Sequence, residues 1–254
     1  MNDSIRKAKK PSKLTRILLS IILLLCVLAL LGYGGLNLIN SRDFQFFGGL
    51  VQRVNTTQKV VALTLDDGPE PGNVEKTLQI LDETGIKATF FLIGDQIEKY
   101  PQEARKIVKA GHELGNHSYS HQRMVLKSYD FMQNEVEKTD RLLRAAGYQG
   151  PIYFRPPNGK KFIMLPYYLS QHQRLTIMWD VEPDSYADVA STPQKLADYT
   201  IAHVQPGSII DLHTMYESRA TSLEALPLMI KGLQKKGYTF VTVEQLLKYN
   251  KAGS

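Results

Sequence analysis

Short apolar strands alternate with amphipathic helices along residues 59–247, and this alternation constrains the fold more than any other feature. Strands are expected at the runs VVALTL, ATFFLIG, YFRPP, LTIMWD, GSIIDLH and YTFVTV. Helices are expected near 73–84, 101–111, 128–146, 162–173, 192–205 and 221–237, with a last one in VEQLLKY. Strands that alternate with helices over about 190 residues predict a parallel sheet with helices outside it. With six or seven such units, we expect an α/β fold that closes into a (β/α) barrel.

The amino-terminal region has a different composition. The first sixteen residues hold six Lys and Arg against Asp3 alone, and no charged residue follows from Ile17 until Arg42. A run of about 20 apolar residues spans the hydrocarbon core of a bilayer. Basic residues before the run place the amino terminus in the cytoplasm. A cleaved secretory signal is the alternative, but no A-x-A pattern follows the run, which favours a retained anchor.

Either interpretation places the rest of the chain outside the cytoplasm. We expect a basic cytoplasmic arm at 1–16, a transmembrane anchor at 17–39, a linker at 40–58 and one domain at 59–254. The net charge is +6, of which the arm contributes +5. The remaining +1 argues against nucleic-acid binding, which needs a basic face on the folded domain. Cys26, the only cysteine, lies in the apolar run and leaves no cysteine for a disulfide in the domain. Nothing in the sequence indicates an obligate protein partner.

Two adjacent carboxylates end the first strand, in the segment TLDDGP. Asp66 and Asp67 follow a buried apolar run and precede Gly68 and Pro69, which turn the chain. Asp-Asp-Gly-Pro is good turn chemistry wherever it occurs. However, the carboxyl ends of parallel strands are also where α/β folds place their reactive groups. Adjacent carboxylates repel each other, so we expect a cation nearby.

Further polar side chains occur at the other predicted strand ends. His117 and His121, four residues apart in HSYSH, present two imidazoles on one side of a turn. One carboxylate added to them gives a ligand set that leaves positions open for water and substrate. Arg155 in FRPPNG is placed to bind a carboxylate, and His213 in IIDLH can titrate near neutral pH. WDVEPDSY adds Glu182 and Asp184, whereas His112, His172 and His203 are expected to be ordinary structural or surface histidines.

TLDDGP, HSYSH, FRPPNG and IIDLH, in this order, resemble the polysaccharide deacetylases of carbohydrate esterase family 4, the NodB-homology domain. KATFFLIG and the ending GYTFVTVEQLL add to the resemblance, which covers roughly residues 59–247. It implies a distorted (β/α) barrel and a metal-dependent hydrolase that removes acetyl groups from N-acetylated sugars of a cell-wall or extracellular polysaccharide. Such a protein would act at the outer face of the cell membrane, held by its single-pass anchor.

The resemblance also implies a role for each site residue. Asp66 matches the general base, and Asp67, His117 and His121 match the metal ligands. Arg155 matches the arginine that orients the base, and His213 matches the general acid. The metal polarises the acetyl carbonyl, Asp66 takes a proton from the attacking water, and His213 protonates the departing amine. Oxygen and nitrogen ligands suit zinc, with cobalt, nickel or iron as alternatives.

Three stretches depart from the family pattern. Asn158, beside Pro157 in the predicted substrate groove, stands where the family usually has an aromatic residue. In EPDSY the second aspartate of the family motif is either Ser185 in register or Asp184 one residue early, and we expect Asp184 to support Arg155. Tyr186 replaces a tryptophan as the surface beside the acetyl group. Asp211 replaces a leucine two residues before His213, on the same face of the strand, and should raise the pKa of that imidazole.

These departures keep two alternatives open. One is a membrane-tethered glycan-binding protein that keeps the barrel but has lost turnover. The other is an O-acetyl esterase on the same fold. The sequence does not decide between amide and ester cleavage, nor does it name the polysaccharide.

Overall fold

The computed structural model describes residues 12–250 of the chain, which divide into two compact units at residues 39 and 40. Helix α1 (Lys13–Asn40) makes up the first unit, and its mean hydropathy reaches 2.8 over 18 residues. Its length and composition are those of a membrane-spanning helix or of a signal sequence. The long apolar helix is therefore confirmed. The basic arm predicted at 1–16 lies mostly outside the described residues.

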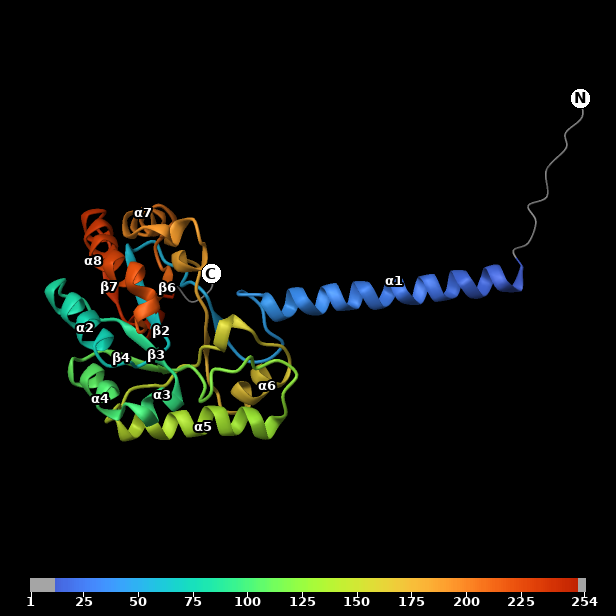
Figure 1. Ribbon diagram of the computed structural model, residues 1–254, viewed down its shortest axis with the longest axis horizontal. Helices are drawn as coiled ribbons and strands as arrows, with labels where there is room; N and C mark the ends of the chain where they lie inside the picture. Colours follow the sequence, from blue (N-terminus) through green and yellow to red (C-terminus); the bar gives the residue numbers. More distant parts are fainter. Residues whose placement is uncertain (1–11, 251–254) are drawn as a thin grey trace, which may run out of the picture. The chain divides into compact units, whose positions relative to one another are not determined.

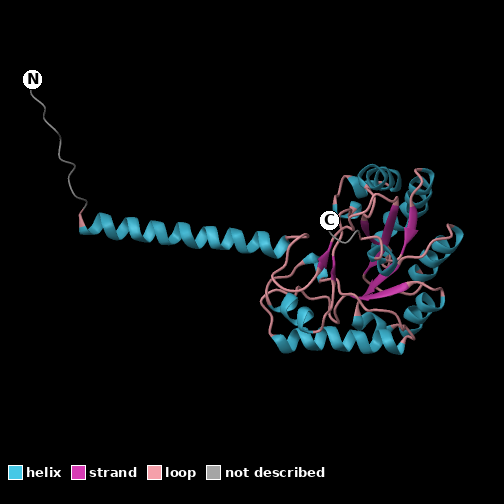
Figure 2. Ribbon diagram, turned by 180° about the vertical axis from the view of Figure 1, so that it is seen from behind, coloured by secondary structure: helices cyan, strands magenta, loops and turns pink. Residues whose placement is uncertain are grey.

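The second unit is built around a parallel sheet whose central strand is β2 (Val60–Asp66). Figure 2 shows the strands in the middle of this unit with helices around them. Strand β2 pairs with three others, and β3 pairs with a fourth; these are β3 (Thr89–Leu92), β6 (Ile209–His213), β7 (Thr239–Val241) and β4 (Glu113–Asn116). Short β1 (Leu50–Val51) pairs with β5 (Thr176–Ile177). Every one of these pairings is parallel, as predicted.

Single backbone bridges join the two groups of strands into a distorted barrel. Phe154 bridges Asn116 at the end of β4 and Thr176 in β5, and Val181 bridges Ile210 in β6. YFRPP was expected to be a strand but contributes only the bridge at Phe154. Proline has no N–H to donate to a strand ladder, so the two prolines after Arg155 stop the pairing there. The strand ladder of the barrel is therefore reduced to single bridges next to Arg155.

The helices lie near their predicted positions. They are α2 (Asn73–Glu83), α4 (Pro101–Lys109), α5 (Tyr129–Ala145), α6 (Met164–Gln171), α7 (Pro193–His203), α8 (Ala220–Lys235) and α9 (Val243–Leu247). Figure 1 shows α2, α4, α5 and α8 around the strands. Gly111, with a φ of 78°, follows α4 and ends it in the left-handed conformation typical of a C-terminal glycine. The sequence analysis missed α3 (Gly94–Lys99), β4 and β1.

Strand β2 is buried on both faces, and its two faces have different roles. Leu63 and Leu65 belong to the large apolar cluster that the sheet forms with α2, α4 and α8. Thr64 and Asp66 alternate with them and so point to the barrel interior. Both interior side chains are buried, at 0 and 2% exposure, and bond to Arg155. The hydrophobic face thus fixes the strand, and the other face carries the polar groups.

Segment 40–58, expected to be a linker or a short packing arm, is fastened to the barrel in this structure. Besides β1, it contributes Val54, whose N–H donates to the carbonyl oxygen of Gly207 at 2.9 Å. The N–H of Gly207 in turn donates to the carbonyl oxygen of Val60 at 2.8 Å. Gly207 has a φ of 82°, and a Cβ there would lie 1.9 Å from the carbonyl oxygen of Val54. Only glycine fits between these two backbones.

This contact gives a stability prediction. Gly207→Ala should cost well over 2 kcal/mol of unfolding free energy, because it adds a clash with backbone to the cost of about 1–2 kcal/mol for a left-handed residue. Gly237→Ala is the matched control, because Gly237 has nearly the same φ, 83°, with its nearest neighbour 3.9 Å away. Urea unfolding of the full chain in detergent measures both. Equal losses for the two variants would show that segment 40–58 is not packed against Gly207.

Candidate active site

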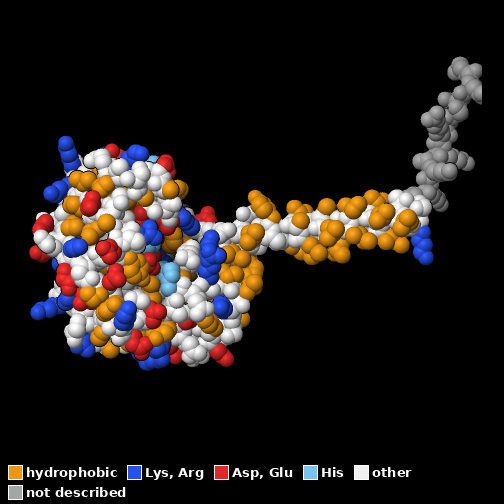
Figure 3. Space-filling model, in the orientation of Figure 1, with side chains coloured by type: hydrophobic (Ala, Val, Ile, Leu, Met, Phe, Trp, Pro, Cys, Tyr) orange, Lys and Arg blue, Asp and Glu red, His pale blue; other side chains and the backbone are white. Residues whose placement is uncertain are grey.

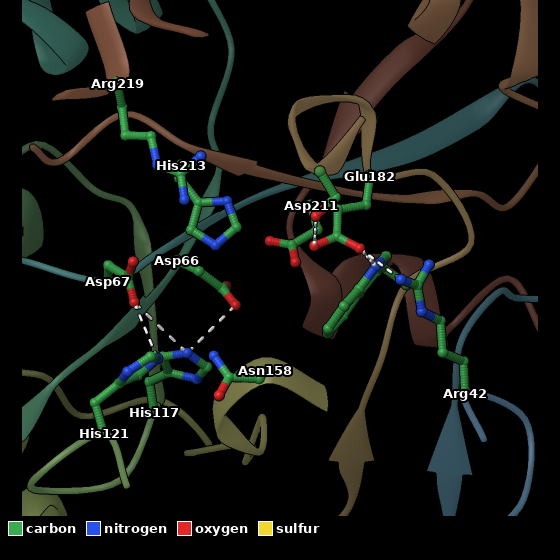
Figure 4. Close-up of a pocket in the computed structure, with 12 residues that line it drawn as sticks. Arg42, Asp66, Asp67, His117, His121, Asn158, Glu182, Asp211, His213 and Arg219 are labelled. Carbon is green, nitrogen blue, oxygen red and sulfur yellow. Dashed lines mark hydrogen bonds and ion pairs between the residues drawn. The ribbon is translucent and has the colours of Figure 1, made fainter. Parts of the chain in front are cut away.

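A cavity of about 310 Å³ opens at the carboxyl ends of the barrel strands. Its lining includes nine residues that the sequence analysis named, which are Asp66, Asp67, His117, His121, Asn158, Glu182, Ser185, Asp211 and His213. It also includes Arg42, Trp179 and Arg219. Figure 4 shows Asp66, Asp67 and the two histidines of HSYSH turned toward one another from different strand ends. The sequence therefore predicted most of the groups that meet here.

The two adjacent aspartates end up with different partners. Asp66 is the last residue of β2, whereas Asp67 has a φ of 76°, in the left-handed region. This backbone turn directs Oδ1 of Asp67 to Nε2 of His121 at 3.3 Å and to Nε2 of His117 at 3.8 Å. Ser118, His121 and Asn158 also have positive φ values. Non-glycine residues in this region are strained, and such strain gathers at functional sites.

Asp67, His117 and His121 fit a divalent metal. Nδ1 of His117 lies 2.9 Å from the carbonyl oxygen of Arg155, which fixes the proton on Nδ1 and leaves a lone pair on Nε2. Burial lowers the pKa of His117 well below its usual value, so the ring is neutral. Oδ1 of Asp67 is buried and has no hydrogen-bond partner within residues 12–250. An unpartnered carboxylate oxygen facing two imidazole nitrogens is the donor set of a metal site.

Arg155 lies fully buried beneath the cavity and holds its acidic groups together. Its Nη1 donates to Oδ1 of Asp66 at 2.6 Å, to Oγ1 of Thr64 at 2.7 Å and to Oδ1 of Asp211 at 3.0 Å. Nε and Nη2 donate to the carbonyl oxygens of Ile177 and Met178. These acceptors come from β2, from β6 and from the end of β5, so one guanidinium connects three parts of the barrel. It is the cation expected beside the paired aspartates.

The expected partnership of Asp184 with Arg155 is wrong, because Asp211 takes that position. Thr64 and Asp211 are directly paired in the β2–β6 ladder, so Asp211 points to the same interior as Arg155. Asp184, in the 3₁₀ turn η2 (Pro183–Ser185), binds His213 instead. Its Oδ2 accepts from the backbone N–H of His213 at 2.9 Å and lies 3.1 Å from Nδ1 of that ring. Asp184 therefore acts on the imidazole.

These carboxylates determine the proton affinity of His213. Burial alone would lower its pKa, but the hydrogen bond with Asp184, and then the charges of Asp211, Asp184 and Asp66, raise it to about 10. The rise in the pKa of His213 agrees in direction with the effect expected from Asp211, although the hydrogen bond with Asp184 contributes more. His213 is therefore protonated at neutral pH. It can donate a proton through Nε2 while Asp184 holds Nδ1.

Asp66 and Asp211 share a single cation. Burial raises the pKa of Asp66, and Arg155 opposes that rise. Burial and the charge of Asp66 raise the pKa of Asp211 well above its usual value. Both carboxylates line the cavity, and Asp66 lies nearer the metal donors, with its Oδ2 3.6 Å from Nε2 of His117. A raised pKa suits a general base, because a stronger base accepts a proton more readily near neutral pH.

Of the three predicted substrate-binding residues, Asn158 alone lines the cavity. Pro157 is buried in the same 3₁₀ turn, η1 (Pro157–Gly159). Tyr186 is not part of the lining; its ring packs against Tyr199 at 5.5 Å. His112, His172 and His203 lie outside the cavity, as expected.

Sequence reasoning missed three residues of the lining, Arg42, Trp179 and Arg219. Trp179, the only tryptophan, ends the apolar run LTIMWD, and that position was a usable signal. Its Nε1 donates to Oε2 of Glu182 at 2.8 Å, and the guanidinium of Arg42 binds the same oxygen at 2.6 Å. Arg42 is simply the first charge after the apolar run, and nothing in the sequence connects it with the site. Arg219, in the turn after β6, is half-buried and has no ion pair within the described part of the chain.

Several known proteins resemble this chain in sequence and in fold. A polysaccharide deacetylase family model matches residues 53–174. The chain is 33% identical over 219 residues to peptidoglycan-N-acetylmuramic acid deacetylase PdaA of Bacillus subtilis, which covers 83% of this chain and 78% of that protein. The chain belongs to the polysaccharide deacetylase family. The expected family, the parallel α/β fold and membership among its hydrolases are thereby confirmed.

Two further members show the range of this deacetylase family. A peptidoglycan-N-acetylglucosamine deacetylase of Bacillus cereus is 28% identical over 210 residues, which are 82% of this chain and 97% of that protein. The crystal structure of a carbohydrate esterase family 4 pseudoenzyme from Bacillus anthracis superposes with a TM-score of 0.73 at 30% identity, over 80% of this chain and 70% of that one. Because the family contains a pseudoenzyme, turnover has to be argued from the residues present. Family members use a divalent metal, which agrees with the donor set of Asp67, His117 and His121.

The contact between Asp184 and His213 gives a pH prediction. Asp184→Asn removes the carboxylate that raises the pKa of His213, so His213 should lose its proton at lower pH. If His213 is the general acid, the alkaline limb of kcat/KM for deacetylation should move to lower pH. Asp198→Asn, at an exposed position of α7, is the control and should leave the profile unchanged. An alkaline limb that does not move in Asp184→Asn would exclude this role for the pair.

Proposed function

We propose that the protein is a membrane-anchored, metal-dependent deacetylase that hydrolyses the N-acetyl groups of peptidoglycan or a related surface polysaccharide. The arrangement of the cavity carries the proposal. One wall presents the Asp67 carboxylate with the imidazoles of His117 and His121, and the opposite wall presents the protonated imidazole of His213. A buried carboxylate, Asp66, lies between them. A glycan-binding site has no use for this separation of metal donors, base and acid.

The proposed mechanism follows from these positions. Asp67, His117 and His121 would hold a divalent ion, and such an ion would supply Lewis acidity to the acetyl carbonyl and to the attacking water. Asp66 accepts the proton of that water. Its carboxylate is held in place by Nη1 of Arg155, which donates to Oδ1 of Asp66 at 2.6 Å. His213 gives its proton to the departing amine, and Asp184 keeps its ring oriented through Nδ1. The backbone beside Asn158 is proposed to donate to the oxyanion.

The substrate is proposed at the level of its chemical class. The named relatives act on N-acetylglucosamine and on N-acetylmuramic acid in peptidoglycan, and both sugars carry the same acetamide. The cavity lining is strongly polar, as a sugar site requires. Trp179 provides one aromatic surface in place of the one missing at Asn158. Tyr186 and Pro157 are proposed to contact more distant parts of the glycan. For the metal we propose Zn²⁺, with Co²⁺, Ni²⁺ or Fe²⁺ compatible with the same ligands.

We further propose that α1 is a retained single-pass anchor with its amino terminus in the cytoplasm and the catalytic domain outside. The basic residues before the apolar run and the absence of an A-x-A pattern after it support this topology. The proposed division of the chain is a cytoplasmic arm, an anchor at 17–39, a connecting segment at 40–58 and the deacetylase domain from 59 onward. The proposal names no nucleic acid and no obligate protein partner.

Acetate release tests the proposed reaction. The purified chain should release acetate from N-acetylglucosamine and N-acetylmuramic acid glycans, lose this activity with a chelator, and regain it with Zn²⁺. His121→Ala should reduce both bound metal and rate, whereas His172→Ala, a histidine outside the cavity, should change neither. Release from O-acetylated glycans alone would make the protein an esterase. Glycan binding without any acetate release, with metal bound, would favour the binding protein.

A further inference from the structure

The wall of the active-site cavity begins two residues after α1. Helix α1 ends at Asn40, and Arg42 already lines the cavity, where it pairs with Glu182 and lies 4.8 Å from the ring centroid of Trp179. Two residues span about 7 Å at most. If the hydrocarbon core takes about 20 residues from Ile17, it ends near Leu36, and the last helical turn adds about 6 Å. Arg42 then lies within about 15 Å of the hydrocarbon along the chain.

Residues 40–47 are fastened to the loop and helix that include residues 160–167. Lys160 donates to the side chain of Asn40, and Lys161 donates to the carbonyl oxygen of Ser41. The rings of Phe46 and Phe162 meet edge to face at 6.0 Å, and those of Phe47 and Tyr167 at 5.5 Å. The segment that leaves α1 is therefore a built part of the domain surface.

This surface exposes large apolar side chains. Phe44, Phe46 and Phe47 are 46, 44 and 40% exposed, and Ile163 and Tyr167 beside them are 45 and 40% exposed. Leu126, at 85%, has the largest exposed fraction among the large apolar residues that the structure describes, and it lies three residues before Tyr129, whose ring meets that of Tyr167. Elsewhere, Figure 3 shows acidic and basic side chains interspersed over the face of the domain that it displays. We call Phe44, Phe46, Phe47, Ile163 and Tyr167 the aromatic face.

We propose that the aromatic face rests in the lipid–water interface of the membrane that α1 spans. Trp and Tyr gather at this depth in membrane proteins because their polar groups stay hydrated, and surface segments that bind membranes bury Phe and Leu there beside basic residues. Three phenylalanines lie within seven residues of the end of α1, so the chain keeps them close to the bilayer that α1 is proposed to span. Lipid is therefore always within their reach, whereas a protein partner would have to approach the membrane surface to bind them. This inference rests on the proposed anchorage of α1.

The proposal restricts the substrate. A cavity whose wall includes Arg42 opens close to the lipid headgroups, so the glycan it reaches is one that lies against the membrane. Newly polymerised or lipid-linked glycan meets this condition, and outer layers of a wall do not. The class of reaction that supplies the substrate is therefore polymerisation of acetylated amino sugars at the membrane surface.

Spin labelling of the full chain tests the proposal. Cys26 is the only cysteine, so a Cys26→Ser background allows one label at Phe46→Cys. Leu228→Cys on α8 is the matched control, because Leu228 is 42% exposed and α8 lies across the domain from α6 in Figure 1. Both variants are reconstituted in vesicles of phosphatidylethanolamine and phosphatidylglycerol. Power saturation then compares the access of oxygen, which concentrates in lipid, with that of a water-soluble nickel chelate.

The label at residue 46 should favour oxygen and the label at residue 228 the nickel chelate. Equal preference for the chelate at both positions would overturn the proposal. Spin–spin broadening at residue 46 that disappears on dilution with unlabelled chain would also overturn it, because a second copy of the chain would then be the partner. Acetate release from soluble glycan is measured on the same samples. Its absence counts against the proposed reaction and leaves the labelling result unaffected.

Discussion

The guanidinium of Arg155 is the interaction on which the site depends. It is fully buried, and a single nitrogen, Nη1, contacts Thr64, Asp66 and Asp211. Its other nitrogens donate to backbone carbonyl oxygens, and Cζ of Arg155 lies 4.2 Å from the ring centroid of Phe91. Removing one member of a buried ion pair typically costs about 3–5 kcal/mol, because a charge is left unpaired. Here two carboxylates would lose their cation together. The position of Asp66 in the cavity, and through it the proposed chemistry, is set by this group.

The barrel gives two adjacent aspartates different partners, and the proposed function gives them different chemical roles. Asp66 ends a strand and stays bound to Arg155, while the left-handed backbone at Asp67 turns the next carboxylate to His117 and His121. On the other side, Asp184 and Asp211 keep His213 charged. The comparison with a pseudoenzyme shows that the fold alone does not guarantee turnover. In this chain a residue is present for each proposed role, with Asp67, His117 and His121 as metal donors, Asp66 as base and His213 as acid. The departures at Asn158, Ser185 and Asp211 leave these contacts intact.

The sequence predicted the site residues better than it predicted their pairing. Motifs at strand ends converge because parallel strands end at one side of the sheet, and this holds without knowledge of register. The partner of Arg155 depends on register, because Asp211 faces it only through the pairing of Thr64 with Asp211. The family motif favoured Asp184 as that partner, yet the turn that carries Asp184 places it beside His213. Short elements such as α3 and β1 were missed because tertiary contacts, more than local propensity, stabilise segments of this length. Arg42 was missed because its role arises from a contact 140 residues away in sequence.

The central claim is the division of labour between Asp66 and Asp67, and both carboxylates approach Nε2 of His117, at 3.6 and 3.8 Å. The most direct measurement is bound metal and acetate release for Asp66→Asn and Asp67→Asn, side by side. Asp67→Asn should lose metal, and added metal should restore part of its rate, because an amide is a poorer ligand than a carboxylate. Asp66→Asn should keep its metal and lose roughly 10²–10⁴-fold in rate at every metal concentration. If Asp66→Asn loses its metal while Asp67→Asn keeps both metal and rate, the assignment of the two aspartates is wrong.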